Sequence, residues 1–187
     1  MLKTRILPAF GGLLALIIIL VLARTFMPAA EQGVGESFDF TPDSDRVARL
    51  MSESVRYKTI SYGRDKPTSG KALLAYHKYL ERSFPNVHKA MKREVVGEYS
   101  LLYTWAGSQP VSLANKPVIL LGHLDVVPVI PGTEADWKQP PFKGVIADGF
   151  IWGRGTLDNK VNIVGLLEAA ENMLAKGLQP KRTIYFA

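Results

Sequence analysis

The sequence of 187 residues contains no cysteine. This absence excludes a disulfide framework, a cysteine-ligated zinc finger, an iron–sulfur cluster and a thiol nucleophile. It leaves the cellular compartment undecided, because a chain without cysteine folds equally well in oxidising and reducing surroundings. The chain also lacks any repeat with a period of about 20 to 50 residues, which excludes a solenoid or a propeller.

Runs of consecutive basic residues are absent too, although the formal net charge is +6. Lys3, Arg5 and Arg24 are three of the 23 basic residues and flank an N-terminal apolar segment, after which all 17 acidic residues lie. The remainder therefore carries 20 basic and 17 acidic residues, a net charge of +3. Because basic and acidic side chains are interleaved there, we expect no nucleic-acid partner.

The apolar segment, Ile6 to Ala23, has 18 positions without a charge. A helix of this length rises about 27 Å, close to the thickness of the hydrocarbon core of a bilayer. We therefore interpret residues 1–27 as a signal-anchor or transmembrane helix, and the excess of positive charge on its N-terminal side predicts that the rest of the protein is exported. The alternative is a cleavable signal peptide and a secreted product, although Ala29-Ala30 makes a poor cleavage site.

Residues 28–41 have the composition of a polar linker, and residues 42–187 have that of a folded domain. Thr41 is the predicted N-cap of the first helix, with Pro42 at its first position. Helical and strand-like segments alternate after this point, which predicts the α/β class. Further helices are expected over 70–84 and 158–176, and strands over 94–96, 100–105, 117–121 and 183–187. The wholly apolar run 117–121 predicts a central strand that is covered on both faces.

His123 and Asp125 follow directly after that apolar strand. Residues two apart in an extended chain point to the same side, so the two side chains project together. A metal-bound imidazole usually donates its other ring N–H to a carboxylate, and open α/β sheets place their sites at the carboxyl ends of strands. The pair is thus a candidate metal ligand with its orienting group. The alternative is that both side chains bond only to loop backbone groups.

A second candidate site is the glycine turn that runs from Gly153 to Lys160 and places Asp158 at a helix N-terminus. A carboxylate is favoured there by the exposed amides, and ordinary helix capping is the alternative interpretation. A dinucleotide-binding loop is excluded, because Asp158 occupies the position of the third glycine. Arg154 and Lys160 either steady this loop or are solvated.

Two further histidines have simpler interpretations. His77 lies in a predicted helix beside apolar residues, and we expect it to be packed. His88 is expected in a turn without a partner at ligand spacing.

Three motifs in order resemble the M20 family of zinc peptidases, in particular its carboxypeptidase S and N-acyl-amino-acid hydrolase branch. They are Gly-His-x-Asp-Val-Val-Pro at 122–128, Trp-x-x-Pro-Pro-Phe at 137–142 and Gly-Arg-Gly-x-x-Asp-x-Lys at 153–160. The resemblance covers residues 42–187. It implies the N-terminal portion of a zinc-peptidase catalytic domain, with a central sheet flanked by helices.

The resemblance also implies a role for each matched residue. His123 would ligate one ion of a two-zinc site, and Asp158 would bridge both Zn²⁺ ions. Asp125 would be the catalytic-site residue that holds His123 in place. A strained peptide bond would follow the bridging aspartate, between Asp158 and Asn159. Two close zinc ions can polarise a carbonyl and acidify a water.

The sequence departs from the family pattern after the last predicted strand. The family has a Glu-Glu pair there, one member being the general base, and later supplies an Asp, a His and a substrate-binding domain. Here no Asp or Glu follows Glu171. We therefore expect an incomplete portion of a hydrolase that cleaves the amide bond of peptides or N-acyl amino acids, with a homodimer through a domain absent here also consistent. The alternative is an inactive, membrane-tethered remnant that binds a metal or a partner.

Overall fold

The computed structural model describes residues 3–27, 41–63 and 69–187, which fall into two compact units, Met1–Thr41 and Pro42–Ala187. The described part of the first unit is helix α1, Lys3–Phe26. Among the described residues, no helix combines the length and the apolar character that a membrane span requires. The predicted linker, apart from Thr41, lies outside the described residues.

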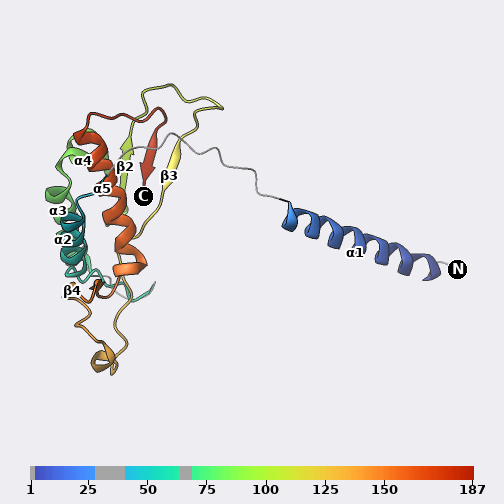
Figure 1. The fold of residues 1–187 in the computed structure, drawn as a ribbon, viewed down its shortest axis with the longest axis horizontal. Helices are drawn as coiled ribbons and strands as arrows, with labels where there is room; N and C mark the ends of the chain where they lie inside the picture. The colour runs from blue at the N-terminus through green and yellow to red at the C-terminus, as the bar shows by residue number, and fades with distance from the viewer. Residues whose placement is uncertain (1–2, 28–40, 64–68) are drawn as a thin grey trace. The chain divides into compact units, whose positions relative to one another are not determined.

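The second unit alternates helices and strands, which confirms the α/β class (Figure 1). Its longer helices are α2 (Ser44–Val55), α3 (Gly70–Ser83) and α5 (Val161–Ala175), with the shorter α4 (Pro85–Ala90), η1 (Glu134–Asp136) and η2 (Thr156–Lys160). Its strands are β1 (Lys92–Val96), β2 (Ser100–Trp105), β3 (Val118–Leu120), β4 (Val145–Ala147), β5 (Phe150–Trp152) and β6 (Ile184–Phe186).

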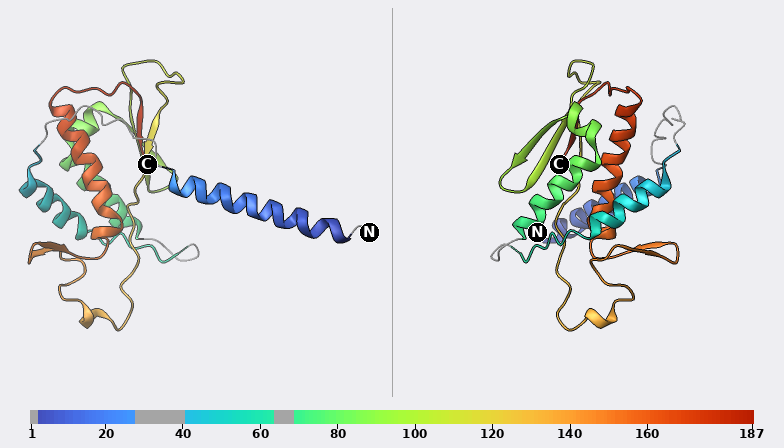
Figure 2. Two further views of the ribbon diagram at one scale, coloured as in Figure 1. Left: turned by 45° about the vertical axis from the view of Figure 1, so that its right-hand side comes forward. Right: turned by 90° about the vertical axis from the view of Figure 1, so that its left-hand side faces the viewer.

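Four strands form the main sheet in the order β1-β2-β6-β3, and helices α2 to α5 lie on one side of it (Figure 2). Strand β2 is antiparallel to both β1 and β6, and β3 is parallel to β6. The expectation that β3 is a central, fully covered strand was wrong for the described chain. Strand β3 pairs with β6 alone there, and Ile119 is 56% exposed because it points away from the helices.

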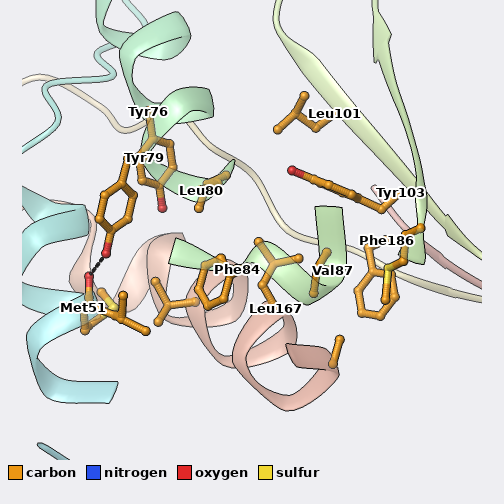
Figure 3. Close-up of a cluster of buried hydrophobic side chains, with 14 of the residues drawn as sticks. Met51, Tyr76, Tyr79, Leu80, Phe84, Val87, Leu101, Tyr103, Leu167 and Phe186 are labelled. Atoms are coloured by element: carbon orange, nitrogen blue, oxygen red, sulfur yellow. Dashed lines mark hydrogen bonds between the residues drawn. The ribbon is translucent and has the colours of Figure 1, made fainter. Parts of the chain in front are cut away.

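The core fills the space between the helices and the sheet (Figure 3). Tyr76, Tyr79 and Leu80 of α3 are fully buried in one core cluster with residues of α2, α5 and β2. The Tyr79 hydroxyl donates to the Leu50 carbonyl of α2 over 2.6 Å, so burial leaves no polar cost at that atom. Each fully buried large apolar side chain stabilises the fold by about 1.5 to 3 kcal/mol.

Two helix starts differ from the sequence expectations. Helix α2 is capped by Asp43, whose carboxylate accepts from the Arg46 amide over 2.9 Å, and not by Thr41. Helix α4 was not predicted. Its first turn is held by Glu171 of α5, whose carboxylate accepts from the amides of Asn86 (3.0 Å) and Val87 (2.9 Å).

Candidate metal centre

His123, Asp125 and Asp158 lie together at the carboxyl edge of the sheet, just beyond β3. The His123 Nδ1 atom is 2.9 Å from the Asp125 carbonyl oxygen and 3.2 Å from its Oδ1 atom. The opposite ring nitrogen, Nε2, is 2.8 Å from Asp158 Oδ1. A carbonyl oxygen can only accept, so Nδ1 carries a proton and donates it to Asp125. This arrangement directs Nε2 toward Asp158.

The charge of this cluster favours a cation. Burial lowers the pKa of His123, but its hydrogen bonds with Asp158 and Asp125 outweigh burial and leave that pKa raised. The Asp158 side chain is 83% exposed and has His123 as its hydrogen-bond partner. An exposed carboxylate beside a directed imidazole is a donor set that suits zinc, and such a metal would take the place of the proton on Nε2.

The spacing of the two donor atoms fits one zinc ion with a small adjustment. Two atoms at ligand distance from a tetrahedral zinc ion lie roughly 3.3 Å apart. His123 Nε2 and Asp158 Oδ1 are 2.8 Å apart, so a shift of about half an ångström would admit the ion. Within the described residues no group of three or more His, Asp or Glu side chains is placed to hold a metal.

The loop that carries Asp158 is not the regular helix start that the sequence suggested. Helix α5 begins at Val161, and Asp158 and Asn159 have non-helical backbone angles. The peptide bond between Asp158 and Asn159 is cis, at the position where the resemblance placed an unusual bond. Gly155, with φ of 84°, sits against Val126, and a Cβ atom on it would collide with the Val126 side chain. Glycine at 155 thus lets the Asp158 loop approach the His123 loop.

Both loops are hydrogen-bonded to the same segment of chain, residues 54–61, which includes the end of α2 and the residues that follow it. The Thr59 hydroxyl donates to the Leu124 carbonyl over 2.7 Å, and the Thr59 carbonyl accepts from the Val126 amide over 2.9 Å. On the other side, Lys160 Nζ donates to the carbonyls of Ser54 and Tyr57, each over 2.7 Å. The 54–61 segment therefore holds the His123 loop and the Asp158 loop at the same time.

Lys160 and Arg154 both steady the structure around the turn. Lys160 is fully buried, its ammonium lies 4.6 Å from the centre of the Tyr76 ring, and burial lowers its pKa to about 7. The Arg154 guanidinium stacks over Trp137 at 5.0 Å, and its amide donates to the Pro141 carbonyl over 2.7 Å. The second and third sequence motifs are thus in direct contact.

The remaining histidines lie outside the site. His77 is buried as expected, with Nε2 2.9 Å from the Tyr99 carbonyl, and burial lowers its pKa. His88 lies in α4 and not in a turn, and it does have partners. Its ring nitrogens are 2.9 Å from the Phe84 carbonyl and 3.0 Å from the Tyr103 hydroxyl.

An apolar cavity of about 360 Å³ reaches the site from inside. It lies between α3, α5 and the sheet, and His123 and Asp125 lie at its polar end. Its apolar wall includes Leu101, Ile163 and Leu166. No local sequence pattern indicates this cavity, because its lining comes from five separate helices and strands.

Residues 119–187 match the model of peptidase family M20/M25/M40. The chain belongs to this family. It is 40% identical over 151 residues to a protein described as probable carboxypeptidase S-like 2 of Dictyostelium discoideum, covering 79% of this chain and 28% of the relative. It is 42% identical over 141 residues to carboxypeptidase S of Saccharomyces cerevisiae, and this match covers 72% of this chain and 24% of the relative. The chain is also 33% identical over 186 residues to N-fatty-acyl-amino acid synthase/hydrolase PM20D1 of Mus musculus, and this match covers 97% of this chain and 36% of the relative.

Solved structures of the M20 family share the fold. Human carnosine dipeptidase 1 superposes with a TM-score of 0.54 at 21% identity, over 76% of this chain and 31% of the other. The M20 metallo-carboxypeptidase Sso-CP2 of Sulfolobus solfataricus superposes with a TM-score of 0.53 at 20% identity, over 76% of this chain and 30% of the other. The chain spans about a quarter to a third of the length of these curated relatives.

Proposed function

We propose that the protein is a metal-dependent hydrolase that cleaves the amide bond of peptides or N-acyl amino acids. In this proposal the chain supplies His123 and Asp158 to a two-zinc site. The observation that carries it is the contact between His123 Nε2 and Asp158 Oδ1, 2.8 Å apart, with the other ring nitrogen of His123 held by Asp125. Membership of the M20 family supports the reaction class.

Each residue has a definite task in this proposal. His123 would hold one zinc ion through Nε2, and the Asp158 carboxylate would serve as a ligand shared by both ions. Asp125 accepts the Nδ1 proton of His123, which fixes the tautomer that presents the Nε2 lone pair to the metal. When bound, the ions acidify a water and polarise the amide carbonyl.

The remaining zinc ligands and the general-base Glu are proposed to lie in a part of the protein outside these 187 residues. The greater length of the relatives supports this. The second candidate, an inactive remnant that binds a metal or a partner, keeps His123 and Asp158 but has no general base. Export of the domain, anchored by residues 1–27, is a proposal that rests on the sequence alone.

The longer protein that contains this chain tests the proposal. His123→Ala and Asp158→Ala are each expected to remove bound zinc, measured by mass spectrometry of the metal, and to abolish amide hydrolysis. His88→Ala is the matched control, because His88 lies outside the site. Full zinc content and activity in either site variant would refute the assignment. Zinc binding without hydrolysis in the parent protein would favour the inactive remnant.

Between the two substrate classes, the apolar cavity beside His123 favours N-acyl amino acids. A cavity of about 360 Å³ with apolar walls suits an acyl chain better than a charged peptide. Leu166→Phe would fill part of it. We expect this variant to lose catalytic efficiency on long-chain N-acyl amino acids and to keep it on short dipeptides. An equal loss of catalytic efficiency on both substrate classes would show that the cavity does not bind the acyl chain.

A further inference from the structure

Lys160 takes no part in the chemistry proposed above, yet it is the most deeply buried charged residue of the site region. Its side chain is fully buried. Its Nζ atom donates to the carbonyls of Ser54 and Tyr57 and lies over the Tyr76 ring. Among the described residues no carboxylate forms an ion pair with it. It touches neither His123 nor Asp158 in these contacts.

Burying an ammonium without an anion is costly, so the surroundings must compensate for it. The Ser54 carbonyl belongs to the last turn of α2, where the helix dipole is negative, and it accepts from the Tyr57 amide over 3.3 Å as well as from Lys160 Nζ. The face of the Tyr76 ring adds a second region of negative potential, 4.6 Å away. Lys160 therefore caps the C-terminal end of α2. In the sequence it lies only two residues after Asp158.

The same segment of chain also holds the His123 loop through Thr59, whose hydroxyl and carbonyl bond to Leu124 and Val126. Lys160 and Thr59 thus attach the two ligand loops to neighbouring points, a few residues apart. We propose that Lys160 is a positioning residue: it sets the separation between His123 and Asp158 and so the metal affinity of the site. This inference rests on the proposed two-zinc function.

The test compares Lys160→Met with Tyr76→Phe. Methionine matches the unbranched shape of lysine but cannot donate to the two carbonyls. Phenylalanine keeps the ring under Lys160 and removes only the hydroxyl that is hydrogen-bonded to Ser54 Oγ over 2.6 Å. Both variants weaken contacts with the same turn of α2, and only the first releases the Asp158 loop. Lys160→Arg keeps the charge and the donors and serves as the rescue variant.

Two measurements separate positioning from general stability. In the longer protein we expect Lys160→Met to lower metal affinity by about ten- to a hundredfold and to change the visible spectrum of the cobalt-substituted enzyme. Tyr76→Phe should leave both unchanged, and Lys160→Arg should recover most of the affinity. In the metal-free 187-residue chain, hydrogen exchange at the Lys160 amide should accelerate more in Lys160→Met than exchange in the middle of α5.

The outcomes separate this inference from the proposed function. If Lys160→Met and Tyr76→Phe lose the same stability and neither changes metal affinity or the cobalt spectrum, Lys160 is structural only and the inference is wrong. If the parent protein binds no metal but the exchange difference appears, the two-zinc proposal fails and the attachment of the loop stands. If Lys160→Met does not fold, Lys160→Gln takes its place, because its shorter, uncharged side chain loses the ammonium that donates to the Ser54 and Tyr57 carbonyls. A lower metal affinity and a changed cobalt spectrum in folded Lys160→Gln would support the inference, and unchanged values there would overturn it.

Discussion

Two pairs of carboxylates in this domain have opposite surroundings. Glu168 and Glu171, on α5, are buried and satisfied by protein donors, with Arg46 on the first and the amides at the start of α4 on the second. Asp158 is largely exposed and Asp125 about half exposed, and both bond to the same histidine. A buried carboxylate whose oxygens already accept several N–H bonds builds the fold. An exposed one that faces a directed imidazole has capacity left for a cation.

The strongest test of this comparison is Asp158→Asn in the longer protein. We expect loss of zinc binding and at least a hundredfold loss of amide hydrolysis, because the amide carries no charge to hold a cation. The free energy of unfolding of the metal-free chain should change by less than about 0.5 kcal/mol, since the side chain is exposed. Urea unfolding and metal analysis check both parts. A large loss of stability would place Asp158 with the structural carboxylates.

Glu171→Gln should give the reverse pattern. Its carboxylate accepts three bonds, from the Asn86 amide and side chain and from the Val87 amide. Charge-assisted bonds of this kind make the loss of the charge cost about 2 to 3 kcal/mol of unfolding free energy. Urea unfolding measures that loss, and a zinc titration of the folded variant should match the parent. A weakened metal affinity would contradict the distinction between the buried carboxylates, which stabilise the fold, and the exposed ones, which face the metal site.

Asp125→Asn should lie between these cases. The asparagine can still accept from His123 Nδ1 but without charge, so we expect a ten- to hundredfold loss of metal affinity. Stability should stay close to that of the parent, because the side chain is about half exposed. Competition with a chelator measures the affinity. An unchanged affinity would mean that Asp125 does not orient His123.

The smallest effect is expected at His77, the buried histidine without a carboxylate partner in the described structure. Its pKa is lowered by burial, so the unfolded chain binds its proton more readily than the folded one. The contribution of neutral His77 is complete above about pH 6.5 and is lost as the pH falls below that value. The unfolding free energy of the parent, relative to His77→Gln, should therefore decrease on acidification. If the difference in unfolding free energy between the parent and His77→Gln stays constant from pH 7.5 to 5, His77 does not contribute to the pH dependence of stability.

The ligand loops could be predicted because their chemistry is local. Residue spacing placed His123 and Asp125 on one side of the chain, and the glycine turn placed Asp158 before a helix. The approach of Asp158 to His123 came from the family resemblance, since 35 positions separate them in the sequence. The residue types were enough to single out His123, Asp125 and Asp158, which the structure brings together, but not to describe the contacts that support them.

The supports depend on contacts between distant parts of the chain. Helix α4 starts where it does because Glu171, 85 positions away from Asn86, caps it. Lys160 finds its partners in the 54–61 segment, more than 100 positions earlier. No local pattern marks either contact. The hairpin of β4 and β5 is different, because its Asp148-Gly149 turn has positive φ at both residues and is a known hairpin signal that the sequence interpretation did not use.

The proposed function requires that His123 and Asp158 bind the same metal ion. The most direct test is anomalous diffraction at the zinc edge from crystals of the longer protein grown with zinc. We expect a zinc peak within about 2.0 to 2.2 Å of both His123 Nε2 and an Asp158 carboxylate oxygen, with Nδ1 still hydrogen-bonded to Asp125. Zinc bound elsewhere, with His123 Nε2 still hydrogen-bonded to Asp158, would contradict it.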